Sequence, residues 1–232
     1  MTHSRHARLK LYAMICRTVA IWRLDKRPPD VRITVEKDVE QLMSDLRGDH
    51  RNMAMLLDLL DGEIDKLASS VKPDYDLVRD IMQYVNEYPD IVHHPKEDLV
   101  YRHLKSLRPE IQTDLERVER DHQYIEEWGL KLNDDIEAIS MGKNLNHDEL
   151  VHGLRHYMEH LREHMHWEEI ELFSLADELQ HYGDWSEVIL ANNEISDPLF
   201  GSRVERKYRT LLDRIQRHTV WNSKKTWRDS TR

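Results

Sequence analysis

The segment HDELVHGLRHYMEHLREHMHWEEIELFSLADEL, residues 147–179, decides the fold. Its apolar positions recur every three or four residues, at Leu150, Leu154, Tyr157, Leu161, Leu172, Leu175 and Leu179. This spacing is typical of a helix that buries one face in a bundle. The pattern is interrupted once, and His164 and Glu168 hold the positions where an apolar residue is missing. An ionisable pair therefore lies on the buried face of this helix.

Three earlier segments, 39–67, 77–104 and 111–139, carry similar apolar stripes. They are separated by helix breakers, which are Pro73, Pro109 and the stretch 142–144, and the second segment should be interrupted where Pro89 and Pro95 occur. Only seven glycines and seven prolines occur in 232 residues, and we find no segment typical of a strand. Long helices joined by short loops alternate in direction. The sequence predicts an all-α, up-down-up-down four-helix bundle.

The other three stripes are interrupted in the same way. The residues at the gaps are His50 in the first, His93 and Glu97 in the second, and His122 in the third. In an antiparallel helical hairpin, two residues equally distant from the turn lie at the same height. For each successive pair among His50, His93, His122 and His164, the midpoint in the sequence falls at the breaker between the two helices. We therefore expect the four histidines to form one layer of the core.

The two glutamates follow a repeat. His93-x-x-x-Glu97 and His164-x-x-x-Glu168 are i, i+4 pairs, so each pair lies on one helix face, and each follows a single histidine by about the same interval. A buried histidine alone is usually a hydrogen-bonded core residue, and one HxxxE pair is usually solvated. A structural polar network is therefore the alternative. Burying two carboxylates costs several kcal/mol each, however, and metal ions would offset this cost. The repeat predicts two half-sites and two metal ions.

Two further histidines lie close to the predicted ligands. His160 is one turn before His164, and His94 is three residues before Glu97. Either could be an additional ligand or could contact a ligand. The repeat favours His93 over His94, because His-x-x-x-Glu then occurs in both halves.

These motifs resemble those of the hemerythrin-like HHE cation-binding family. They are GDHRNM around His50, HHPKED from His93, RDHQYI around His122 and EHMHWEEIELF from Glu163 to Phe173. The resemblance covers about residues 36–180, and DPLFGSRVERKYR at 197–209 is similar to a C-terminal extension of bacterial members. It implies a four-helix bundle with a di-iron centre.

The sequence departs from the oxygen-carrying members of that family. They use five histidines, with an HxxxH pair on the third helix, whereas Glu126 follows His122 here. Four histidines with two glutamates resemble instead the iron-centre-repair and iron-sensing members. The thiol chemistry of the repair proteins is not implied, because the cysteine-bearing domain on which it depends has no counterpart in this sequence.

Imidazole and carboxylate ligands suit iron, manganese or zinc, and iron is favoured in two-metal bundles. If Glu97 and Glu168 bridge the ions and each ion takes two histidines, a bridging oxo or hydroxo group leaves one open position on each iron. O₂, NO or peroxide would bind there. We favour a protein that binds or senses O₂ or NO. The alternatives are an oxidoreductase that turns over peroxide, NO or O₂, and an iron-responsive interaction module. No general acid or nucleophile stands out besides the ligands, and no redox partner can be identified.

The chain divides by charge. Its net charge is −10, but both ends are basic and the middle is strongly acidic, which disfavours nucleic acid as a partner. We expect an N-terminal amphipathic helix or extension at 1–33, an HHE domain at 34–182, and a C-terminal helical extension with a basic tail at 183–232. The sequence has a single cysteine, which fits a reducing compartment. It has no stretch of ~20 apolar residues that could span a membrane, and Arg17 interrupts the apolar stretch 11–22, which disfavours a signal peptide. We therefore expect a cytoplasmic protein without a membrane span.

Overall fold

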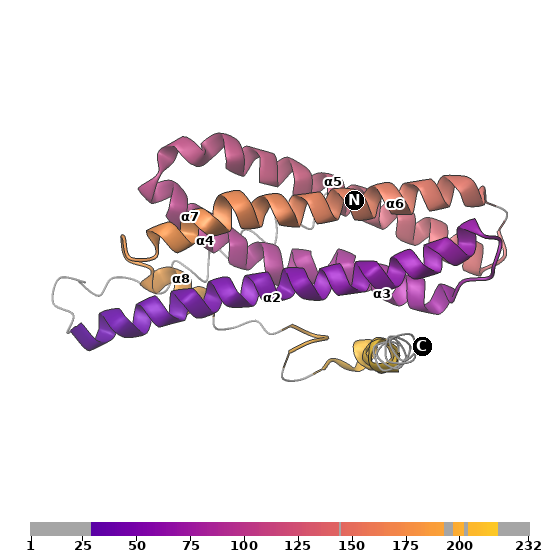
Figure 1. Ribbon diagram of the computed structural model, residues 1–232, viewed down its shortest axis with the longest axis horizontal. Coiled ribbons are helices and arrows are strands. Elements are labelled where there is room, and N and C mark those ends of the chain that lie inside the picture. Colours follow the sequence, from indigo (N-terminus) through magenta and orange to yellow (C-terminus); the bar gives the residue numbers. More distant parts are fainter. Residues whose placement is uncertain (1–28, 144, 193–196, 202–203, 218–232) are drawn as a thin grey trace, which may run out of the picture.

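The computed structural model describes residues 29–143, 145–192, 197–201 and 204–217. Within these ranges it is helical and has no strand, which confirms the all-α prediction. Four rods lie along the long axis (Figure 1). The first rod is α2 (Pro29–Ala68), and the second is α3 (Tyr75–Tyr88), which continues through a π-helical turn (Pro89–His93) into α4 (His94–Leu107). The third rod is α5 (Gln112–Ser140). The fourth is α6 (His147–Glu168), which continues through a second π-helical turn (Glu169–Phe173) into α7 (Ser174–Leu179).

The breakers in the sequence are the turns of the structure. Pro73 lies in the loop between α2 and α3, and the Asp74 side chain caps α3 by accepting from the Leu77 amide. Pro109 opens a short 3₁₀ turn before α5. Gly142 adopts φ +80° just after α5, and such a left-handed residue closes a helix C-terminus at little cost when it is glycine. The rods therefore alternate in direction as predicted.

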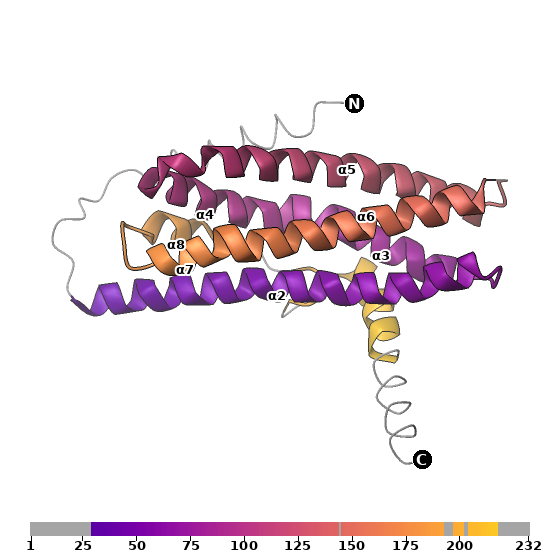
Figure 2. The ribbon, with the colours of Figure 1, turned by 45° about the horizontal axis from the view of Figure 1, so that its top comes forward.

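The four rods form a ring in the order α2, α3, α5 and α6, and Figures 1 and 2 show each beside its neighbours. The approach of α3 to α5 is close at Gly129, where an added Cβ would lie 2.0 Å from the Asn86 side chain. That Asn86 oxygen accepts a hydrogen bond from Tyr157 of α6 at 3.0 Å. Gly129 therefore lets one polar contact join three helices inside the bundle.

The apolar core is divided into two parts. One cluster fills the end of the bundle near the α2–α3 turn and includes Leu57, Ile81 and Leu154. The other fills the opposite end and includes Leu42, Leu104 and Phe173. The histidines and glutamates singled out above lie between them. The two clusters stabilise the fold from both sides, so the polar layer between them does not have to.

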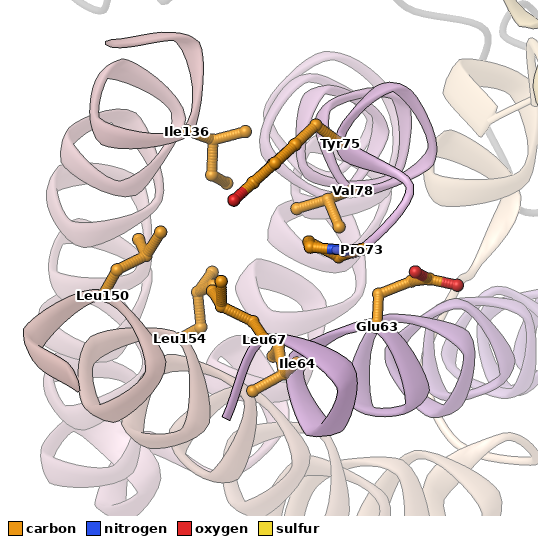
Figure 3. Close-up of a pocket in the computed structure, with 9 residues that line it drawn as sticks. All are labelled: Glu63, Ile64, Leu67, Pro73, Tyr75, Val78, Ile136, Leu150 and Leu154. Atoms are coloured by element: carbon orange, nitrogen blue, oxygen red, sulfur yellow. The ribbon is translucent and has the colours of Figure 1, made fainter. Parts of the chain in front are cut away.

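A small cavity lies beside the α2–α3 turn (Figure 3). Its lining is apolar except for Glu63 and the Tyr75 hydroxyl, which points into the space between Ile136 and Leu150 in the figure. The buried Glu63 carboxylate accepts from the Asp74 amide at 2.8 Å and from Lys66 at 2.6 Å. Glu63 therefore holds the turn, and both of its oxygens already have donors.

The C-terminal segment packs against the bundle where it is described. It contains α8 (Ser186–Asn192), a 3₁₀ turn (Arg206–Tyr208) and a helix at 209–217. Tyr84 donates to Asp197 at 2.9 Å, and the basic side chains of Lys207 and Arg214 pair with Glu87 and Asp74. The basic end of the chain thus contacts the acidic bundle.

The N-terminal amphipathic helix expected around residues 11–22 lies outside the described residues. No helix in the described part of the chain is long and apolar enough to cross a membrane.

Candidate metal centre

Six ionisable side chains meet in the layer between the two apolar clusters. Each rod contributes to it: His50 from α2, His93 and Glu97 from the α3–α4 rod, His122 from α5, and His164 and Glu168 from α6. None is more than 4 % exposed. The sequence placed these residues at one height from their spacing, and the structure brings them together there.

The two glutamates lie between two groups of histidines, which are His50 with His93 and His122 with His164. His93 Nε2 is 3.0 Å from Glu97 Oε1, and His164 Nε2 is 3.2 Å from Glu168 Oε2, each one turn away on the same rod. The other two histidines each reach both carboxylates. His50 Nε2 is 3.7 Å from Glu97 Oε1 and from Glu168 Oε2, and His122 Nε2 is 3.8 Å and 3.7 Å from their other oxygens. Glu97 thus presents one oxygen to His50 and His93 and the other to His122, whereas Glu168 Oε2 lies near both His50 and His164.

His94 joins this layer as a fifth histidine. Its ring stacks on that of His122, with centroids 3.6 Å apart. Nitrogen atoms of His94, His122 and His164 lie within 4.8 Å of one another, and so do ligand atoms of His50, His93 and Glu97. The two ends of the layer are therefore unequal, with two histidines at one and three at the other.

The π-helical turn explains how two consecutive histidines both face the core. The amide of His94 donates to the carbonyl of Pro89, five residues earlier, so the turn holds one residue more than an α-helical turn. Pro95 then lies in the first turn of α4, where its missing amide hydrogen is not needed. The two prolines thus mark a local change of helix that adds His94 to the inward face.

Carboxylates on the outside orient the histidine rings. The Nδ1 atoms of His50, His93 and His94 lie 3.1 to 3.3 Å from carboxylate oxygens of Glu169, Asp49 and Asp90, in that order. His164 Nδ1 is 3.7 Å from Asp121. Of these contacts, those of His50 with Glu169 and His93 with Asp49 are hydrogen bonds, whereas Nδ1 of His94 and of His164 forms none with a described residue. A histidine that donates Nδ1–H outward keeps the Nε2 lone pair for a ligand inside, which is the usual arrangement of metal-binding imidazoles.

The family model described as "Hemerythrin HHE cation binding domain" matches residues 41–176, more than half of the chain. The chain belongs to this family. Neither a comparison with curated proteins nor one with solved structures finds a match. The matched residues contain the whole polar layer, and the histidine and glutamate groups of this layer could hold a metal ion.

The donors of the hemerythrin HHE domain fit a metal. Glu97 Oε2 and Glu168 Oε2 are buried and form no hydrogen bond with any described residue, although imidazole nitrogens lie near them. A buried carboxylate oxygen without a hydrogen bond is costly unless a cation contacts it. Imidazole nitrogen and carboxylate oxygen together suit iron, manganese and zinc.

The pKa values of the two carboxylates are shifted in opposite directions. Burial works against the charge of Glu97, but His93 and His50 outweigh it, so the pKa of Glu97 lies well below its usual value. Burial and the charge of Glu97 raise the pKa of Glu168. Two carboxylates that share a layer cannot both ionise freely. A dication between them would remove this conflict.

Tyr101 is part of the layer but was not among the site residues predicted from the sequence. Its hydroxyl donates to Glu168 Oε1 at 2.9 Å and lies 3.4 Å from Glu97 Oε1. The available signal was its position four residues after Glu97. Phe173 lies five residues after Glu168, at the end of the second π-helical turn, and stacks on the His50 ring. The hydroxyl is therefore present in only one of the two halves.

His160, the other histidine left open from the sequence, lies outside the layer. Its side chain is 28 % exposed, and its Nε2 is 3.9 Å from Asp121 Oδ1. Asp121 also contacts His164, so the Asp121 carboxylate lies between His160 and this predicted ligand.

A cavity of about 10 Å³ adjoins the layer, which is enough for a water-sized molecule. Ionisable side chains from both histidine groups line it, together with apolar residues: His50, His93, His94, His164 and Glu168 on the one hand, and Met53, Pro89, Ile125, Leu161 and Met165 on the other.

Proposed function

We propose that this hemerythrin HHE domain binds two iron ions and, at one of them, a small ligand such as O₂ or NO. The observation that carries the proposal is the buried layer in which Glu97 and Glu168 lie between two groups of inward-facing imidazoles. Iron is preferred over manganese and zinc, with an oxo or hydroxo group between the ions. When bound, the iron pair would supply reversible redox chemistry toward O₂ or NO.

The two ions would be held unequally. His94, His122 and His164 would hold one ion and His50 and His93 the other, with Glu97 and Glu168 shared. The ion at His50 and His93 would then have one protein ligand fewer. This replaces the equal sharing considered from the sequence, because His94 lies with the second group. The small ligand would bind to the ion at His50 and His93, because that ion would have one protein ligand fewer.

Metal analysis and O₂ exposure test the proposal. Protein purified without added metal is expected to contain about two irons per chain. After anaerobic reduction, mixing with O₂ in a stopped-flow spectrometer should give an absorbance change that reverses when O₂ is removed. Folded protein that contains no iron and takes up none from ferrous salt would overturn the proposal.

A second candidate function is turnover of peroxide, NO or O₂. The observation that favours it is the Tyr101 hydroxyl, which places a proton and an oxidisable ring against both glutamates. The same stopped-flow experiment separates the two functions. Consumption of O₂ in excess of the protein, with no reversal when O₂ is removed, indicates turnover.

A further inference from the structure

Helix α6 carries histidines at every fourth position from the metal centre toward its N-terminal end. They are His164, His160, His156 and His152. The first is 3 % exposed, the second is 28 % exposed, and the last two are exposed. Residues four apart on a helix are neighbours about 6 Å apart on nearly one face. The histidines thus form a continuous row from solvent to the buried layer.

Side chains of α5 line the same row. Asp121 lies between its two inner members, with Oδ1 3.9 Å from His160 Nε2 and Oδ2 3.7 Å from His164 Nδ1. The Tyr124 ring meets the His160 ring edge-on at 4.6 Å, and its hydroxyl hydrogen-bonds His156 Nε2 at 2.9 Å. Arg117 also pairs with Asp121, at 3.6 Å. Polar contacts therefore connect His156, His160 and His164 through Tyr124 and Asp121.

These donors are suited to a divalent cation. Histidines one turn apart on a helix are a common metal-binding pair, and they bind only when neutral. Burial lowers the pKa of His160, which favours its neutral form. A hydrated cation loses water at a high cost, so it needs replacement ligands at each step into a buried site.

We propose that His152, His156, His160 and Asp121 form a metal-uptake path, which captures a divalent ion at the surface and passes it to His164. The inference rests on the proposed function, since it requires a metal centre at the end of the path. Such a path changes only the rates at which the metal ion enters and leaves the centre. It should speed uptake and release equally and leave the equilibrium affinity unchanged.

Stopped-flow binding of Co²⁺ to the metal-free full chain tests this, with the visible absorbance of the ligated ion as readout. The variant combines His156→Ala with His160→Ala. The matched control combines His166→Ala, exposed on the same helix but outside the row, with His181→Ala, an exposed histidine beside Glu36. We expect uptake and chelator-driven release to slow about tenfold in the variant and to be unchanged in the control. Final occupancy and Kd should equal those of the wild type.

Uptake as fast in the variant as in the wild type would overturn the path. Faster release with weaker affinity would also overturn it, because His160 or His156 would then be an equilibrium ligand or a support of the fold. Wild-type protein that binds no metal would refute the proposed function instead, and this outcome is distinguishable because the control would fail in the same way.

Discussion

The hydroxyl of Tyr101 donates a hydrogen bond of 2.9 Å to Oε1 of Glu168, from one rod to another. Tyr101→Phe should keep the iron content, because none of the predicted ligands is removed. It should shift the visible spectrum of the iron-loaded protein, because Glu168 would bind metal without this donor, and should cost about 1 kcal/mol of unfolding free energy. Tyr157→Phe, which removes a hydroxyl bonded to Asn86 instead, is the control and should leave the spectrum unchanged. Identical spectra for both variants would show that the Tyr101 contact has no influence on the centre.

Replacing either shared carboxylate should remove both metal ions. Glu97→Gln and Glu168→Gln each delete the charge that lies between the two histidine groups, so neither ion keeps its full set of ligands. Iron content after gel filtration is the measurement. Glu63→Gln changes a buried glutamate at the end of the bundle and should retain both irons. One tightly held iron in either shared-carboxylate variant would argue that this glutamate serves a single ion.

His94→Ala should weaken the two binding steps unequally. His94 lies with His122 and His164, so the ion at that end loses one of three imidazoles while the ion at His50 and His93 keeps its set. Titration of the metal-free protein with Co²⁺ should show one step weakened at least about tenfold and the other close to wild type. Two unchanged steps would indicate that His94 only packs against His122.

Metal-free and metal-loaded protein should respond to pH in opposite directions. Without metal, burial alone would lower the pKa of His93, but Glu97 and Asp49 outweigh it and raise the pKa to about 10. A histidine whose pKa is higher in the folded than in the unfolded state stabilises the fold when it is protonated. For His93 this stabilisation is fully present below the unfolded pKa of about 6.5, and it is lost as the pH rises toward the folded pKa of about 10. The raised pKa of Glu168 acts in the same direction, because deprotonation places a second charge in the layer.

The metal-loaded protein should instead lose stability in acid. Histidines bind metal only as neutral imidazoles, so protons displace the ions as pH falls below about 6. Thermal unfolding from pH 5 to 9.5 should give a Tm that falls with rising pH in the metal-free protein, and a Tm that falls below pH 6 in the loaded protein. Parallel curves for the two forms would contradict metal binding by these histidines.

The bundle and the meeting of six side chains follow from the sequence alone. Helical period, breakers and equal distances from each turn fix the height of every residue in an antiparallel bundle, which is why His50, His93, His122 and His164 could be placed in one layer. That these residues bind metal remains a prediction.

Only the tertiary structure decided how the layer is completed. The inward direction of His94 depends on a π-helical turn, and an extra residue in one turn leaves no mark in the 3.6-residue period. The bond from Tyr101 to Glu168 and the position of Asp121 between His160 and His164 join different rods. Such contacts depend on rotation and spacing between packed helices to within an ångström or so, and one-dimensional periodicity does not contain that information.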